Sequence, residues 1–95
     1  MFSWDADKAR KNYEKHGVTF EEAATAFGDS EAFEAEDMEN PDLSERRWKR
    51  LAFSIRDRVL LVIYTFRRLS DGTETIRIIS ARQATRNERK IFAGQ

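Results

Sequence analysis

The chain has 95 residues, the length of one domain, and folding would bury about 60–65% of its unfolded surface. Hydrophobic residues make up 40% of it and aromatic residues 12%, which suffices for a small core and excludes a disordered chain. The absence of cysteine excludes disulfides and Cys-based zinc sites, and the formal net charge is zero. We therefore expect one domain over residues 1–95.

The zero net charge hides an uneven distribution along the chain. Residues 21–45 hold ten Asp and Glu and no Lys or Arg, whereas residues 46–95 hold thirteen basic residues against four acidic ones. The second half therefore has a local charge of +9. This asymmetry predicts a basic surface that attracts polyanions and an acidic surface that could meet a basic partner.

The N-terminal segment has no apolar run typical of a signal peptide. No stretch of the sequence approaches the roughly 20 apolar residues of a membrane span. Together with the absence of cysteine, this predicts a soluble protein of the cytoplasm that has no membrane partner.

The first elements can be predicted from their end signals. The opening MFSW is aromatic and typical of an edge strand. Asp5 can cap a first helix, because its carboxylate can accept from free backbone N–H groups. Gly17 is well placed to end that helix, since glycine readily adopts the left-handed conformation found there.

A second helix and a short strand are expected next. Thr19 and Glu22 have the spacing of a capping box, and Gly28 would end the apolar stripe that follows. Residues 30–37 predict a short strand, and residues 38–45 predict a polar loop around the only proline.

From Trp48 onward the sequence alternates in the manner of strands. The first strand is half-buried, with one side formed by Leu51, Phe53 and Ile55. Residues 59–66 predict a central strand, because β-branched residues and flanking turns favour a strand over a buried helix. Tyr64 in this strand is expected in the core with its hydroxyl near a partner. An Asp-Gly pair at residues 71–72 promotes a hairpin into a strand over residues 74–81.

Thr85 and Glu88 repeat the capping-box spacing, so the last helix would begin near Arg86. Ser80 and Gln83 offer an alternative start. The whole pattern predicts an α+β fold with an antiparallel sheet of about four strands, two N-terminal helices and one C-terminal helix. The helices would group against one face of the sheet.

Four blocks of sequence occur in a specific order: FSWDADKARKNYEKHGVTFEEAATAFGD, ERRWKRLAFS, VLLVIYTFR and IRIISARQATRNERKIF. Together they span nearly the whole chain, and they resemble the BrnT family of toxins from type II toxin–antitoxin systems. The chain departs from that family's pattern at Ala52, where glycine is common, and at Arg46, where an acidic residue is common.

The resemblance implies a RelE-like fold and a metal-independent endoribonuclease that needs no cofactor and inhibits translation. It also implies an RNA substrate and a BrnA-type antitoxin with a ribbon-helix-helix domain. The antitoxin would neutralise the toxin, and the complex would repress its own operon. DNA would thus be contacted only indirectly, through the antitoxin complex.

Metal-independent RNA cleavage uses the ribose 2′-OH as nucleophile and needs a base, an acid and cations for the charge on the phosphate. The planar guanidinium fork of arginine matches phosphate oxygens. A metal site is disfavoured, because the lone histidine has no cysteine or second histidine beside it. The expected catalytic residues are His16, Arg47, Arg77 and Arg82, with Arg47 carried over from the resemblance.

Each catalytic candidate also has a plainer interpretation. His16 could simply stabilise the C-terminus of its helix. Arg77 could extend from a strand into cross-strand pairing. Arg82 follows a buried strand and precedes a helix, where active-site residues often collect.

The expected RNA-binding residues are Lys15, Trp48, Arg86 and Arg89. Lys15 belongs to the same helix end as His16, and Trp48 is either a core residue or a platform for stacking bases. Arg86 and Arg89 could instead form a solvated helix face. The alternative function is a non-enzymatic module that binds RNA or protein through the basic half of the chain.

Overall fold

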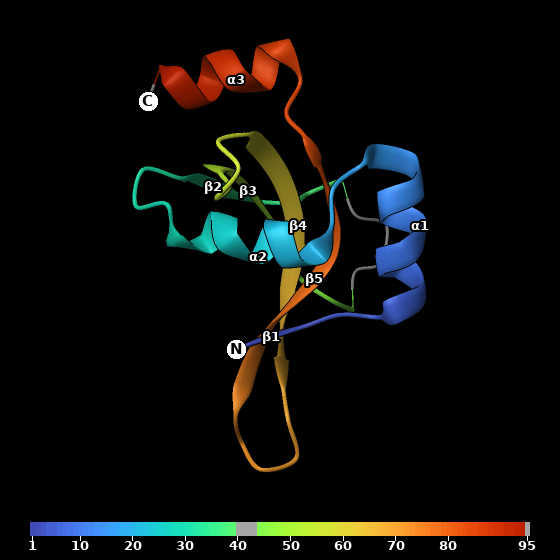
Figure 1. The fold of residues 1–95 in the computed structure, drawn as a ribbon. Helices are drawn as coiled ribbons and strands as arrows, with labels where there is room; N and C mark the ends of the chain where they lie inside the picture. Colours follow the sequence, from blue (N-terminus) through green and yellow to red (C-terminus); the bar gives the residue numbers. More distant parts are fainter. Residues whose placement is uncertain (40–43, 95) are drawn as a thin grey trace.

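The computed structural model describes residues 1–39 and 44–94 (Figure 1). In chain order the elements are β1 (Phe2–Ser3), α1 (Ala6–His16), α2 (Phe20–Thr25), a 3₁₀ turn (Ala26–Gly28), β2 (Phe33–Glu36), β3 (Trp48–Phe53), β4 (Val59–Arg68), β5 (Glu74–Gln83) and α3 (Arg86–Ala93). The expected polar loop over residues 38–45 lies partly outside the described residues.

Within the described residues, one sheet contains five strands in the order β1-β5-β4-β3-β2. β2, β3, β4 and β5 pair antiparallel, whereas β1 pairs parallel with β5 at Ile76 and Arg77. The expected antiparallel strands are therefore confirmed for β2 to β5, whereas the parallel β1 makes the sheet five-stranded and mixed. β1 and β5 are far apart in sequence, and α1, α2 and three strands lie between them, so no hairpin joins the two strands.

The helices cover both faces of the sheet. Leu60 and Val62 of β4 belong to the larger core, which also contains residues of α2 such as Phe20. Leu61, next in sequence, packs toward α3 in a smaller core with Phe92. The expected grouping of all helices on one face was wrong, because a central strand that is apolar on both faces needs cover on both.

α1 is attached to the edge of β5 by one buried side chain. The Asn12 amide donates to the Ala81 carbonyl at 2.8 Å and accepts from the Ala81 N–H at 3.1 Å. It also donates to the carbonyl of Val18 at 3.0 Å. These bonds satisfy the backbone of β5 beyond the point where β1 stops pairing with it.

The predicted ends of α1 and the predicted start of α3 are confirmed. Asp5 accepts from two backbone N–H groups of the first turn, and Gly17 has the left-handed conformation with φ of 70°. Thr85 and Glu88 form a complete capping box. The alternative helix start at Ser80 and Gln83 was wrong, because these residues belong to β5.

The capping box predicted for α2 forms only in part. Thr19 accepts from the Glu22 N–H at 3.0 Å, as expected. The Glu22 carboxylate, however, binds Arg58 and accepts from the hydroxyl of Ser54 at 2.7 Å. Those hydrogen bonds, led by the one from Arg58, hold the pKa of Glu22 below its usual value. A long-range ion pair has replaced the local bond.

The expected buried side of β3 was also wrong. Leu51 and Ala52 are both buried because they face different cores. Phe53 is half-exposed at the strand end, and Ile55 lies beyond the strand in a turn where it is 78% exposed.

Tyr64 is in the core, as expected, and its hydroxyl donates to Glu34. Burial, followed by this bond, raises the pKa of the phenol above its usual value.

Candidate functional site

The sheet face opposite α2 is only partly covered by α3. The Cα register places Lys49 of β3, Ile63 of β4 and Ser80 of β5 side by side across this face, and all three are half-buried. The next row along the face, toward α3, consists of Leu51, Leu61 and Arg82. We call this surface the open face and define it by Arg47, Lys49, Ile63, Arg77, Ser80 and Arg82.

A cavity of about 420 Å³ lies on the open face and joins two segments that are distant in sequence. Arg47 enters it just before β3, and Arg82 enters it from β5. The cavity lining is completed by Lys49, Leu61, Ile63, Asp37, Glu39 and Glu88. Two of the four expected catalytic residues therefore lie around one hollow, together with carboxylates that the sequence did not single out.

Both arginines of this cavity are held by carboxylates. Arg82 makes a two-point contact with Glu88, at 2.8 Å and 2.9 Å. The hydrogen bonds from Arg82 are the main reason why the pKa of Glu88 is lowered to about 2. Arg47 lies 3.4 Å from Glu45. These contacts orient the guanidinium groups and offset part of their charge.

A second cavity, of about 250 Å³, lies between α1 and β5. It brings Lys15 and His16 together at the end of α1, with Ser80 on the opposite wall. Its remaining lining residues are Lys8, Lys11, Asn12 and Ile79. Ser80 is the Cα partner of Ile63, which lines the first cavity, so lining residues of the two cavities are neighbours across this strand pair.

Arg77 lies further along β5, between Thr65 of β4 and Ser3 of β1. It is near Asp5 at the beginning of α1. The pKa of Asp5 is lowered mainly by a hydrogen bond from the Lys8 N–H, and the charge of Arg77 adds to this effect. Arg77 lines neither of the two cavities above.

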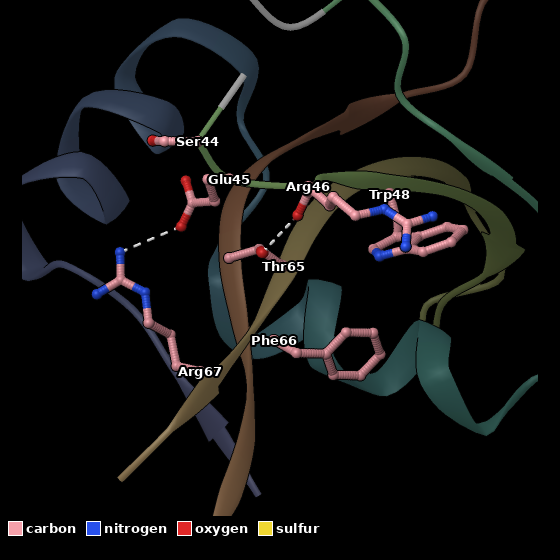
Figure 2. Close-up of a pocket in the computed structure, with 7 residues that line it drawn as sticks. All are labelled: Ser44, Glu45, Arg46, Trp48, Thr65, Phe66 and Arg67. Atoms are coloured by element: carbon pink, nitrogen blue, oxygen red, sulfur yellow. Dashed lines mark hydrogen bonds and ion pairs between the residues drawn. The ribbon is translucent and has the colours of Figure 1, made fainter. Parts of the chain in front are cut away.

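Trp48 lies in a different hollow, of about 650 Å³, shown in Figure 2. The Arg46 guanidinium lies 5.1 Å from the centre of the Trp48 ring and covers one ring face. Glu36 holds Arg46 there through two bonds of 2.9 Å. The structure thus separates Trp48 from the cavities that contain His16 and Arg82.

Arg86 and Arg89 are exposed on α3. The side of α3 that meets the sheet instead carries Glu88, Ile91 and Phe92. The structure therefore does not bring these two arginines into the cavities.

The acidic and basic parts of the chain do not form two separate surfaces. β2 pairs with β3, so acidic residues lie directly beside basic ones. Ion pairs of 2.9–3.3 Å join Glu36 to Arg46, Glu34 to Arg50 and Glu45 to Arg67. The local charge of +9 therefore overestimates the basic surface, because long-range pairing neutralises part of it.

Several residues of the site were missed from the sequence, namely Lys8, Lys11, Asn12, Lys49 and Glu88. The three-, four- and seven-residue spacings among Lys8, Lys11 and Lys15 could have indicated a shared helix side. Strand alternation could have placed Lys49 on the side of Leu51. No local signal indicates that Glu88 meets Arg82.

Within the part of the chain that the structure describes, no three His, Cys, Asp or Glu side chains gather in a way that could hold a metal ion. None of the described helices is long and apolar enough to cross a membrane.

Comparison with known proteins identifies the family. The model of a family described as the ribonuclease toxin BrnT of type II toxin–antitoxin systems matches residues 4–88. The chain belongs to the BrnT family. The matched range includes His16, Arg47, Arg77 and Arg82, as well as Glu88, the carboxylate partner of Arg82, whereas Arg89 lies beyond it. A ribonuclease toxin of this kind implies an RNA substrate and an antitoxin partner.

The crystal structure of the Brucella abortus ribonuclease toxin BrnT has a similar fold, with a TM-score of 0.61 and 21% sequence identity. The similarity covers 90% of this chain and 99% of the Brucella chain. No curated protein matches the chain.

Proposed function

We propose that this BrnT-family chain is a metal-independent endoribonuclease that inhibits translation, acting in the cytoplasm as a single RelE-like domain over residues 1–95. The observation that carries the proposal is a pair of cavities whose lining residues meet across β4 and β5. They gather His16, Arg47 and Arg82 from three separate segments around the paired residues Ile63 and Ser80.

The reaction uses groups that RNA itself supplies. The ribose 2′-oxygen attacks the neighbouring phosphorus, the O2′–P bond forms and the P–O5′ bond breaks. The products are a 2′,3′-cyclic phosphate and a free 5′-hydroxyl. A base takes the 2′-OH proton and an acid gives one to the leaving oxygen. His16 suits either transfer, since histidine is the side chain used most often for this purpose.

Arg82 and Arg47 would hold the phosphate as its negative charge grows. Preorganised cations are typically among the largest contributions to such catalysis. Their carboxylate partners fix the two guanidinium groups before substrate arrives, so the phosphate would enter a site already oriented for it. Arg77 would add positive charge beside the strand.

The partner would be a BrnA-type antitoxin with a ribbon-helix-helix domain. It would silence the toxin by covering part of the region 46–50 or 82–90, using acidic or apolar groups. DNA would be reached only through the antitoxin, when the complex represses its own operon.

The direct experiment is to incubate purified protein with single-stranded RNA in the presence of EDTA. We expect cleavage products that end in a 2′,3′-cyclic phosphate. A matched RNA with 2′-O-methyl groups should remain intact, because its 2′-oxygen can no longer act as nucleophile. Tight RNA binding without cleavage would contradict the proposal and favour a non-enzymatic RNA-binding module.

A further inference from the structure

The basic residues of α1 lie on two different sides of the helix. Lys8, Lys11 and Lys15 share the side that lines the cavity against β5. Arg10 lies outside that lining and is held at 3.0 Å by both Asp7 and Glu14. The acidic residues of α1 therefore pair with Arg10, outside the cavity, and form no ion pair with the three lysines that line it.

The three lysines are exposed, and no ion pair joins any of them to another of the described residues. They differ in this respect from Arg47 and Arg82, whose charge is partly offset by Glu45 and Glu88. An anion from outside the protein would therefore meet unpaired charge at Lys11 and Lys15, and at Lys8 a charge that Asp5 offsets only in part.

The position of this lysine row relative to the open face is fixed. Asn12 lies within the row and holds the backbone of Ala81 through two hydrogen bonds. Arg82 is the next residue of the same strand. From Lys8 to Lys15 the helix advances about 10 Å. The row therefore lies along the edge of β5 next to Arg82, on a helix whose position Asn12 fixes.

We propose that Lys8, Lys11 and Lys15 form a phosphate-binding row that holds the RNA strand adjoining the cleavage site. The inference rests on the proposed function, because it takes the ligand to be RNA. Ammonium groups on flexible stems bind phosphate as point charges. The row therefore binds the RNA backbone without sequence preference and lets the strand run from the cavity of Arg82 along α1.

The test measures binding separately from cleavage. The probe is a single-stranded 2′-O-methyl RNA, which lacks the reactive hydroxyl, followed by fluorescence anisotropy at several salt concentrations. A plot of log affinity against log salt concentration has a negative slope. In the triple variant Lys8→Ala, Lys11→Ala, Lys15→Ala, this slope should become shallower by about 2. That change corresponds to about 0.7 for each of three lost phosphate contacts on a single strand.

Two control variants test whether the change in slope comes from the charge of the three lysines. Arg10→Ala removes one positive charge from the same helix, but from a residue already paired, and should leave the slope unchanged. The triple Lys→Arg variant keeps the charges and should retain the slope. Thermal unfolding of the lysine variants should match the wild type, because the lysines are exposed.

The outcomes separate this inference from the proposed function. Wild-type protein that binds the probe but does not cut ordinary RNA would contradict the ribonuclease proposal and leave the row standing. An unchanged slope in the triple alanine variant, or no binding of the probe by wild type, would overturn the row. An unchanged slope with lost neutralisation by the antitoxin would assign the lysines to the protein partner and likewise overturn it.

Discussion

Arg82 holds the carboxylate of Glu88 through both of its terminal nitrogens, at 2.8 Å and 2.9 Å. The same carboxylate accepts from the Thr85 N–H at 2.9 Å as part of the capping box of α3. One side chain therefore joins the arginine of β5 to the beginning of α3. A phosphate that binds Arg82 must share the guanidinium with Glu88 or displace it.

We predict that Arg82→Ala lowers kcat/KM for RNA cleavage by about 10²-fold, on the scale known for the loss of one charge-stabilising group. Arg82→Lys should restore only part of this loss, because an ammonium lacks the two-point fork. The melting temperature should fall by a few degrees, since a partly exposed ion pair contributes about 1 kcal/mol or less. Single-turnover cleavage and thermal unfolding measure the two effects.

The matched control for Arg82 is Glu88→Gln, which breaks the same ion pair but leaves the guanidinium in place. It should lose similar stability and retain cleavage. If both variants lost cleavage equally, Arg82 would act through the position of α3 and not through the phosphate.

The Arg82–Glu88 pair also predicts a change of stability at acid pH. The folded protein lowers the pKa of Glu88 from 4.5 to about 2, so folding favours the charged carboxylate. This contribution is complete above about pH 4.5 and is lost as the pH falls toward 2. Urea unfolding should show the free energy of unfolding of wild type exceeding that of Glu88→Gln by about 1 kcal/mol near pH 6, allowing for solvent screening. A difference that stayed constant down to pH 2 would contradict this assignment.

The sequence predicts those parts of the fold that have local causes. Asp5, Gly17, Thr85 and Glu88 act within a few residues of themselves, and the helix ends follow from them. The parallel pairing of β1, the helices on both faces and the loss of Glu22 from its capping box depend on residues far away in sequence. No pattern confined to a short stretch contains that information.

In the candidate site, too, residues with local sequence signals could be predicted, and contacts between distant segments could not. Arg82 could be singled out because the sequence predicted a buried strand just before it and a helix just after it, although the structure extends β5 through Arg82 itself. Its carboxylate partner could not, since the contact requires α3 to turn back over the sheet. Charge counts along the chain were similarly incomplete, because the pairing of β2 with β3 places Glu34 beside Arg50.

Asn12 is predicted to be the main attachment of α1 to β5. Asn12→Ala would leave the Ala81 N–H, the Ala81 carbonyl and the Val18 carbonyl without this buried partner. Each buried polar group left unpaired typically costs about 1–3 kcal/mol. Asn12→Asp keeps an acceptor but loses the donor, so it should also destabilise. Hydrogen exchange should show faster exchange of the Ala81 amide. Unchanged protection at Ala81 in both variants would show that other contacts hold α1.

His16 is predicted to transfer a proton during cleavage. His16→Gln keeps a side chain of similar size at the end of α1 and should lower kcat by about 10²–10⁴-fold, the usual range for acid–base catalysis. Binding of the 2′-O-methyl RNA should not change, because the arginines and lysines remain. A variant with normal kcat and a lower melting temperature would instead assign His16 to stabilising the helix C-terminus.

The last prediction concerns the antitoxin. An apolar cavity of about 220 Å³ lies between α3 and the sheet, lined by Phe33, Leu51, Leu61, Ile91, Lys49 and Glu88. Its last two lining residues and Leu61 also line the cavity of Arg82. A partner that fills the apolar cavity would therefore reach the arginines as well, and acidic groups on it would meet Arg47 and Lys49.

We expect Ile91→Asp to weaken antitoxin binding by at least about 30-fold, the effect of removing a central apolar contact, and to leave RNA binding nearly unchanged. The antitoxin to use is a ribbon-helix-helix protein encoded beside this gene. Leu69→Asp, which changes an exposed leucine beyond the end of β4, is the control and should not alter either affinity. Raising the salt concentration should weaken RNA binding steeply and antitoxin binding much less, because burial of apolar surface does not depend on released counterions. RNA and antitoxin bound to the same toxin molecule at once would contradict a shared surface.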